Sequence, residues 1–368
     1  MIRIIRKLAV ISLLASFSPL QAASWVTYPP AGTPNGKRIV FISGDEEYRS
    51  EEALPMLAKI LAVHHGFHCT VLFSLNPTTG NIDPNNQTNT PGLAAIQQAD
   101  LVFLFTRFRE WPDSTMRYFA DHYVAGKPFI GIRTATHAFN YTRNTASPYA
   151  RYDFASTVWP GGFGKQVLGE TWVNHWGIHG SQSTRGIIRA ASASHVILKG
   201  VANIWGPTDV YQVGTLPADA TVLVDGQVLT GMNSTDPALA GKATMPIVWT
   251  RQISATRIVT STIGAATDMA NAGLRRLLVN ACYWAVGMEN SIPALSVVDY
   301  VGTYNPTNFG LNLFTTGVKP DDLALPVPLL KSRFHSLGQD FKTLERGWKL
   351  NFYRFDGRRI RSLPLYIP

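Results

Sequence analysis

The amino-acid sequence predicts an α/β fold in which a doubly wound, mainly parallel sheet carries helices on both faces. Strand-like apolar segments alternate with helix-like segments between residues 38 and 132, as they do in chains that build parallel sheets. Three of these strands end abruptly in charged residues, and the ligand sites of doubly wound sheets lie at such strand ends. A hydrophobic content of 45% over 368 residues is enough for a large core.

Two strands and a helix open the predicted sheet. Residues 38–43 have the apolar interior of a central parallel strand, and residues 68–74 form a second strand. Ser50 is expected to cap the helix between them, because a serine side chain can accept from the first free N–H groups of a helix. Glu51 and Glu52 in its first turn suit the helix dipole.

Two further strands continue the same alternation. A short helix at residues 93–98 leads to a third strand at residues 100–106. Pro112 and Asp113 then open a second long helix, and residues 128–132 form the fourth strand. All four strands are expected to run parallel, with right-handed crossovers between them.

The pattern becomes less regular after residue 141. Residues 141–185 are rich in glycine and aromatic residues, and long structured loops of this kind are often functional. Further short strands are predicted at residues 186–190, 208–213, 221–229, 246–251 and 257–263. Residues 271–287 give a clear amphipathic helix that ends at Gly287.

The chain divides into five predicted segments. These are a signal peptide (1–22), an exposed linker (23–36), the main domain (37–290), an extended closing segment (291–330) and a basic, poorly packed tail (331–368). The signal peptide is predicted from a basic start followed by a short apolar run and a small residue before the cut near Ala22. An uncleaved anchor is the alternative, but the run is short for a bilayer, which needs about 20 residues. The protein is therefore expected to be exported, periplasmic or extracellular, without a transmembrane segment after cleavage.

The charge distribution excludes one class of function, and the two cysteines are expected to be structural. The net charge is +9, but the excess lies in the first seven residues and in residues 331–368, so the body is neutral and no nucleic-acid partner is expected. Cys69 falls on a predicted strand and Cys282 on a late helix. They are expected to be two buried, unpaired thiols, although one disulfide is not excluded by the sequence.

Six motifs can be recognised along the chain, at residues 42–55, 105–109, 131–139, 161–172, 204–211 and 274–285. Together they resemble the ThuA-like (trehalose utilisation) family, and in particular an exported form common in planctomycete-type bacteria. The resemblance covers about residues 37–325. The resemblance implies a flavodoxin-like fold of the class I glutamine amidotransferase type. It also implies a sugar-related role, although fold alone does not establish activity.

The same resemblance exposes one departure from the amidotransferase pattern. Those relatives carry a nucleophilic cysteine at a tight turn after this strand, and the matching position here is Arg133, in Gly131-Ile-Arg-Thr-Ala135. A guanidinium stays protonated and cannot act as that nucleophile. Neither cysteine of the chain lies near in sequence, so thiol-based glutaminase activity is not expected.

The candidate site residues follow the strand ends. Acid–base chemistry is assigned to Glu46, Glu47 and His137. Ligand binding is assigned to Asp45, Tyr48, Arg49, Arg107, Arg109, Arg133, Thr134 and Trp172. Some of the arginines are expected to form internal ion pairs instead, and Trp172, Trp176 and Trp205 are either core residues or flat faces on which sugar rings stack.

A metal site is a separate alternative. His175 and His179, with Glu170 upstream, offer two imidazoles and one carboxylate, a ligand set that suits a divalent metal. Gly177 and Gly180 indicate a loop, so a spacing of four residues does not place both histidines on one face. No Gly-x-Gly-x-x-Gly follows a strand, so no dinucleotide cofactor is expected.

Three hypotheses for the function remain open at this stage. The first is an exported carbohydrate-active enzyme that uses acid–base or metal-assisted chemistry. The second is a non-catalytic module that binds a saccharide or an anion, and the third is a structural protein of the cell envelope. A small saccharide-like ligand is the expected partner, and the sequence leaves the oligomeric state undetermined.

Overall fold

The computed structural model describes residues 24–308, 310–311 and 317–325, together with the backbone of residues 349–353 and 359–364. The predicted signal peptide and most of the predicted tail lie outside the described residues. Within the tail, β13 (Lys349–Tyr353) and β14 (Arg359–Pro364) pair as an antiparallel hairpin.

A ten-stranded sheet forms the centre of the fold, in the order β1-β3-β2-β4-β5-β12-β11-β10-β7-β8. Its parallel part consists of β3 (His68–Phe73), β2 (Arg38–Gly44), β4 (Leu101–Thr106), β5 (Phe129–Ile132) and β12 (Thr256–Ser261). In chain order this is 2-1-3-4-5, the order of flavodoxin-like sheets. The predicted α/β, doubly wound class is therefore confirmed.

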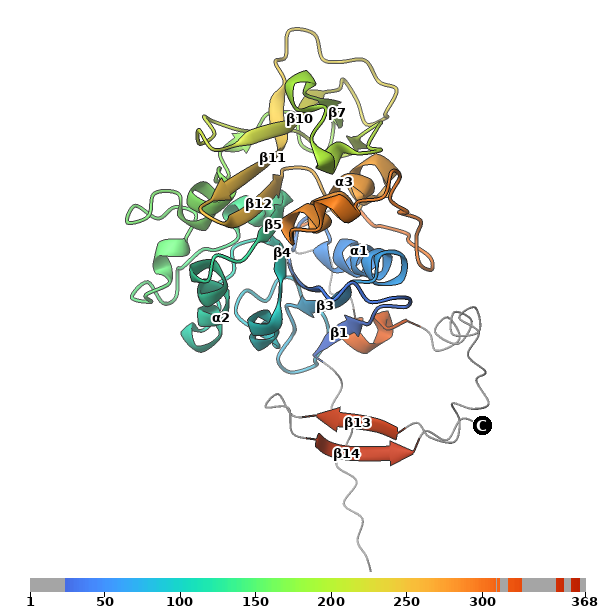
Figure 1. The fold of residues 1–368 in the computed structure, drawn as a ribbon. Coiled ribbons are helices and arrows are strands. Elements are labelled where there is room, and N and C mark those ends of the chain that lie inside the picture. The colour runs from blue at the N-terminus through green and yellow to red at the C-terminus, as the bar shows by residue number, and fades with distance from the viewer. Residues whose placement is uncertain (1–23, 309, 312–316, 326–348, 354–358, 365–368) are drawn as a thin grey trace, which may run out of the picture.

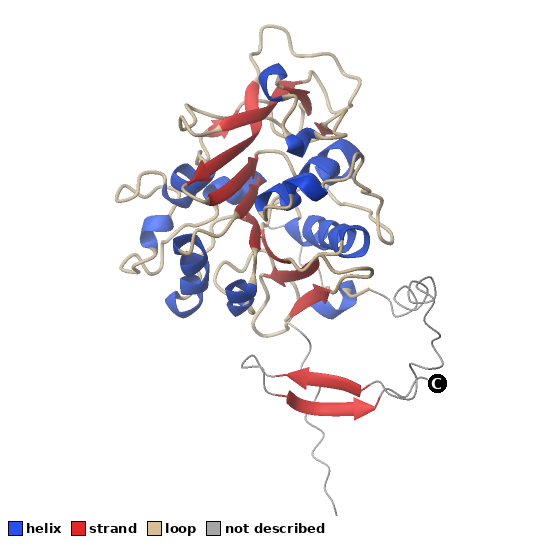
Figure 2. Ribbon diagram, in the orientation of Figure 1, coloured by secondary structure: helices blue, strands red, loops and turns tan. Residues whose placement is uncertain are grey.

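Antiparallel strands extend this sheet beyond β12 (Figure 2). They are β11 (Met245–Ile253), β10 (Thr221–Val228), β7 (Thr184–Ile188) and β8 (Trp205–Gly206). The strand predicted at residues 208–213 is confirmed in place but is wrong in length, because only the two residues of β9 (Tyr211–Gln212) form a strand there. It pairs with β6 (Asn174–His175) in a separate two-stranded sheet.

The first described residues correct the predicted linker. Residues 25–28 form strand β1 (Trp25–Tyr28), which pairs antiparallel with β3 at the edge of the sheet. Val26 and Tyr28 are buried, and the Tyr28 hydroxyl donates to the Leu323 carbonyl at 2.8 Å. The proline and glycine content was misleading here because those residues lie just after the strand.

Helices cover both faces of the sheet, as Figure 1 shows. One face carries α1 (Ser50–His65) and α3 (Ala272–Ala285), and the other carries α2 (Asp113–Val124) and the 3₁₀ helix η1 (Leu93–Gln98). The alternation within β4 divides its side chains between these two layers: Phe103 packs in the α1 and α3 core, whereas Leu104 packs in the α2 core.

The start of α1 differs from the prediction. Ser50 does not cap the helix; the residue before it, Arg49, takes a left-handed conformation with φ of 61°. The Ser50 hydroxyl instead bonds the Ser43 hydroxyl at 2.8 Å and accepts from the Asp45 N–H at 3.0 Å. Ser50 therefore ties the end of β2 to the start of α1 and shapes the loop between them.

The predicted closing segment packs against the start of α1. The Thr307 hydroxyl donates to Glu52 at 2.7 Å, and the Gly310 N–H donates to the Glu47 carbonyl at 3.0 Å. Its 3₁₀ helix η9 (Pro320–Leu323) contacts β1. This segment therefore supports the β2–α1 loop from outside.

Two further features bear on the sequence analysis, namely the state of the two cysteines and the length and apolar character of the helices. Cys69 on β3 and Cys282 on α3 are both buried and free, which confirms the predicted unpaired thiols. Among the helices of the described residues, none combines the length and the apolar character needed to cross a membrane.

Gly164 makes a close contact that predicts a clear stability effect. It opens the π-helical turn η4 (Gly164–Leu168), and a Cβ on it would lie 1.9 Å from the carbonyl oxygen of Thr136. We expect Gly164→Ala to lower the free energy of unfolding by about 1–3 kcal/mol, because both backbones must move apart. Urea unfolding measures this. Gly32→Ala is the control, since nothing lies within 4 Å of its Cβ position; equal effects of the two variants would contradict the prediction.

Candidate functional site

The candidate site lies at the carboxyl edge of the parallel strands. The exits of β2 and β4 lie side by side there, and in a flavodoxin-like sheet this is the switch point where the strand order reverses. The β2 exit supplies Asp45, Glu46 and Glu47, and the β4 exit supplies Arg107 and Arg109. The sequence prediction that these charged exits would converge is confirmed by their ion pairs.

Glu46 bridges the two arginines. Its Oε1 accepts from Arg107 Nη1 at 2.5 Å, and its Oε2 accepts from Arg109 Nη2 at 2.9 Å. Arg109 is fully buried and also donates to the carbonyls of Pro84 and Asn86. The predicted ligand-binding role of Arg109 does not fit this burial, because all of its donors point into the protein. Glu46, expected to be catalytic, is likewise held as a structural partner.

Asp45 is the buried centre of the loop after β2. Its carboxylate accepts from the N–H groups of Glu47 and Tyr48 and from the Thr134 hydroxyl. Burial, with Glu46 as the next cause, raises the pKa of Asp45 to about 7, although the bonds from Thr134 and Tyr48 act in the opposite direction. Asp45 and Thr134, both predicted ligand-binding residues, instead hold the β2 and β5 exits together.

The turn after β5 keeps the strained geometry of an elbow. Arg133 begins the 3₁₀ helix η2 (Arg133–His137) with φ of 48°, a value that is unusual for a residue with a side chain. Strain of this kind clusters at functional sites, where the surrounding structure holds it. The expectation that an elbow lies at this position is thus supported by its backbone.

The Arg133 side chain points into the protein rather than toward a ligand. Its guanidinium is fully buried and donates to the Asp209 carboxylate at 2.8 Å and to the Tyr48 hydroxyl at 3.0 Å. The rings of Tyr48 and Tyr211 lie on it at 4.3 and 3.9 Å from their centroids. Arg133 and Tyr48, both predicted to bind ligand, therefore form the floor of the site.

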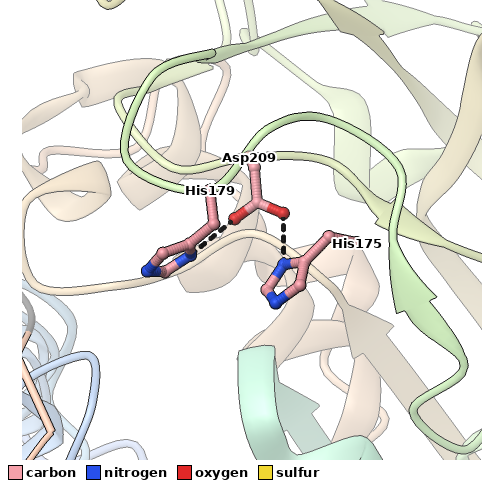
Figure 3. A group of neighbouring side chains, drawn as sticks. All are labelled: His175, His179 and Asp209. Carbon is pink, nitrogen blue, oxygen red and sulfur yellow. Dashed lines mark hydrogen bonds and ion pairs between the residues drawn. The ribbon is translucent and has the colours of Figure 1, made fainter.

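The Asp209 carboxylate contacts two histidines, as Figure 3 shows. His175 Nδ1 lies 2.7 Å from Asp209 Oδ2, and His179 Nδ1 lies 3.3 Å from Asp209 Oδ1. Burial alone would raise the pKa of Asp209, but Arg133 and the two imidazoles hold it well below its usual range. Asp209 is therefore a carboxylate over the whole physiological range, with three cationic or N–H partners.

Glu170 corrects the predicted metal-ligand set. Its carboxylate accepts from Lys165 Nζ at 2.8 Å and from the Gly214 N–H at 2.8 Å, and it is not part of the histidine group. Asp209 takes the place that was assigned to Glu170. Sequence reasoning missed Asp209, although it lies within the quoted motif at residues 204–211, where one acidic residue precedes an apolar pair.

His137 lies beneath Trp172 at the edge of the same site. The two ring centroids are 5.9 Å apart, and Phe108 lies 5.2 Å from His137 on another side. Burial, followed by the nearby charges of Arg107 and Arg133, holds the pKa of His137 well below its usual value. His137 is therefore a neutral imidazole at physiological pH, so of its predicted acid–base roles only that of a base fits its charge.

Five partly exposed side chains lie around the histidines and are the candidates for contact with a ligand. They are Glu47, Arg107, Trp172, His175 and His179; Glu46 and Phe108 beside them are partly exposed as well. Glu47 lies 3.8 Å from His179 Nε2 and 3.5 Å from Arg107 Nε, so it connects the charged exits to the histidines. Arg49, predicted to bind ligand, pairs with Glu51 and Glu52 and lies apart from these five.

The fold and the site together define a flavodoxin-like protein of the class I glutamine amidotransferase type, with a buried arginine at the elbow. Within that class, the chain belongs to the ThuA family, whose description is trehalose utilisation. The family model matches residues 38–285, which is most of the chain. This membership supports a sugar-related role, and it confirms the family that the motifs indicated.

Two solved structures with similar folds are ThuA-like proteins. One, from Parabacteroides merdae, is 16% identical, with a TM-score of 0.47 over 69% of this chain and 90% of its own. The other, from Bacteroides uniformis, is 15% identical, with a TM-score of 0.43 over 72% of this chain and 96% of its own. A comparison with curated proteins gave no match.

Proposed function

We propose that this chain is a carbohydrate-active enzyme whose saccharide lies over Trp172, His175 and His179 at the carboxyl edge of the sheet. One observation carries the proposal. The solvent-open groups of the site form one connected row from Trp172 through the two histidines and Glu47 to Arg107, whereas Arg133 and Asp209 are buried and paired with each other. Membership of a family described as trehalose utilisation supports a sugar as the ligand.

Each open group has a chemical role in this proposal. The Trp172 ring gives a flat apolar face against which a pyranose ring can lie, which is the usual wall of a ligand site. Arg107 donates to sugar hydroxyls, and Glu46 and Glu47 fix its guanidinium for this. The buried pair of Arg133 and Asp209 keeps the floor rigid and neutral overall.

Glu47 supplies the acid–base chemistry. It is the open carboxylate nearest to an imidazole, 3.8 Å from His179 Nε2, and a carboxylate can accept a proton from a sugar hydroxyl or a water and return it. The position of the amidotransferase cysteine is occupied by Arg133, so the proposed reaction forms no thioester. His137 takes a positioning role, since it supports the Trp172 ring from below.

A second candidate is a module that binds the saccharide without transforming it. It is favoured by the elbow, where a buried arginine has replaced the usual nucleophile. It is also favoured by the extent of internal pairing, since Arg49, Arg107, Arg109 and Arg133 all form ion pairs. The Glu47→Gln variant separates the two candidates. If the protein is an enzyme, the variant loses the turnover that the unaltered protein shows but still binds the saccharide. If the protein is a binding module, neither form shows turnover and both bind the saccharide.

Export is part of the proposal and rests on the sequence of residues 1–22, which predicts a signal peptide. An exported protein would meet its saccharide in the periplasm or outside the cell.

The Trp172→Ala variant tests the proposed ligand and its position. We expect the Kd for trehalose or a related disaccharide to rise about tenfold, because loss of one aromatic face removes about 1.4 kcal/mol. Isothermal titration calorimetry measures this for the full chain. Trp284→Ala is the matched control, because Trp284 lies on α3 and contacts Arg257 at the start of β12, which is the opposite end of the parallel strands from the site. Absence of saccharide binding by the unaltered protein, or equal losses in both variants, would overturn the proposal.

A further inference from the structure

We infer that His175, His179 and Asp209 bind one divalent metal ion of the zinc type, at the edge of the proposed saccharide site. The inference deepens the proposed function and rests on it for the role of the ion, which would polarise a sugar oxygen or a water. The binding of the ion itself is independent of any saccharide and is tested separately.

The spacing of the donor atoms fits such an ion. One ligand atom from each of the three side chains lies within 4.8 Å of the others, and the two contacts to Asp209 are 2.7 and 3.3 Å. Zinc bonds of about 2.0–2.2 Å place tetrahedral neighbours about 3.4 Å apart. Small imidazole rotations would therefore bring Nδ1 of both histidines and one Asp209 oxygen around a common centre.

The Asp209 carboxylate is already oriented for this task. Arg133 holds its Oδ1 at 2.8 Å, and the Arg133 Nη1 group donates to the Asp209 carbonyl at 2.8 Å. Oδ2 is the remaining oxygen and faces His175 Nδ1. Metal-binding carboxylates are usually fixed by such outer hydrogen bonds, which orient the oxygen that binds the ion.

The histidine loop is fixed by backbone pairing next to Asp209. His175 lies on β6, where it pairs with Tyr211 of β9, and the Trp176 N–H donates to the Val210 carbonyl at 2.8 Å. These bonds hold the loop against the segment that carries Asp209. The convergence of both histidines is therefore a consequence of the β6–β9 pairing rather than of their spacing in the sequence.

The number of donors and their access favour an ion over a purely hydrogen-bonded group. Arg133 already pairs with Asp209, so two further imidazole partners exceed what one buried carboxylate needs, and the Glu47 carboxylate beside His179 adds negative charge. The side chains of His175 and His179 are 35% and 32% exposed, so an ion can reach them and keep one position open for a ligand. Glu47 lies 3.8 Å from His179 Nε2, the ring nitrogen that does not face Asp209, so it can orient the ring while Nδ1 holds the ion.

Zinc binding to the chelator-stripped full chain tests the inference. Equilibrium dialysis with elemental analysis should give one Zn²⁺ per chain, and Co²⁺ should give the visible absorption of a tetrahedral site. His175→Ala and His179→Ala should each weaken Zn²⁺ binding by roughly 100-fold or more, because loss of an outer hydrogen-bond partner alone costs 10–100-fold. His64→Ala is the control, since it removes a partly exposed histidine at the end of α1.

The possible outcomes separate this inference from the proposed function. No Zn²⁺ or Co²⁺ binding, or equal binding by all three variants and the unaltered chain, would overturn the metal site. Circular dichroism of each variant shows whether it is folded, so a weakened site is not confused with an unfolded chain. Saccharide binding by the metal-free protein would leave the proposed function standing, whereas zinc binding without any saccharide binding would leave only the metal site.

Discussion

Replacement of Asp209 by alanine is expected to lower the free energy of unfolding by about 3–5 kcal/mol, since it leaves a buried guanidinium without its anion. The side chains of Arg133 and Asp209 are both fully buried, and their contact is 2.8 Å. Two tyrosine rings enclose Arg133, so water cannot replace the lost carboxylate. Denaturant unfolding at pH 7 with EDTA present measures this loss without a contribution from bound metal.

A solvent-exposed pair of the same kind provides the control. Arg189 and Asp225 form a bidentate contact at 2.9 and 2.6 Å, but the Arg189 side chain is 42% exposed. Asp225→Ala should therefore cost at most about 1 kcal/mol. Asp209→Asn should fall between the two, because an amide oxygen can still accept from Arg133. A loss of less than 1 kcal/mol in Asp209→Ala would show that the buried pair does not hold the floor of the site.

We expect the free energy of unfolding of Asp45→Asn to rise relative to that of the unaltered protein as the pH increases. Burial raises the pKa of Asp45 from 3.8 to about 7 in the folded protein. Between these values the folded state holds a proton that the unfolded state has released, so the stability from Asp45 is present below about pH 4 and is lost by about pH 7. An asparagine carries no charge and escapes this loss.

The difference in unfolding free energy between Asp45→Asn and the unaltered protein isolates this group from the other titrating side chains. We expect the difference to move in favour of the variant by on the order of 2–4 kcal/mol between pH 4.5 and pH 8, at about 1.4 kcal/mol per pKa unit. Asparagine can keep the bonds from the Glu47 and Tyr48 N–H groups and can donate to Thr134. A difference that stays constant with pH would contradict the prediction.

Glu51→Gln provides a second test with the same sign. Burial raises the pKa of Glu51 to about 7, although the nearby charge of Arg49 opposes the change. Its stability contribution is therefore also present at low pH and lost as the pH rises toward 7. If Asp45→Asn fails to fold, the pH dependence of Glu51→Gln still decides whether buried carboxylates at this edge titrate near neutrality.

The parallel half of the fold could be predicted from the sequence because its signals are local. Each central strand is buried on both sides and is therefore a continuous apolar run, and each crossover helix has its own periodicity. β1 was missed because a four-residue edge strand is too short to give such a signal. β1 pairs with β3, which lies about 40 residues further along the chain, and a local sequence pattern does not identify so distant a partner.

The edge of the sheet that carries the site could also be predicted, since strand direction alone brings the charged exits of β2, β4 and β5 together. The roles of the individual residues could not. Arg109 and Arg133 were expected to face a ligand, but both are fully buried and paired inside the protein. Burial of a charge depends on partners from distant segments, and Asp209 comes from a loop 76 residues beyond Arg133.

The sequence by itself therefore determined the doubly wound sheet, its functional edge and the family, because these follow from local hydrophobic patterns and contiguous motifs. Only the tertiary structure decided which charges are structural and which remain open. It replaced Glu170 with Asp209 beside His175 and His179, since the β6–β9 pairing sets that contact. The physical reason is that the energy of a charged side chain depends on its solvent exposure and its partners, and both are fixed by contacts between segments far apart in the chain.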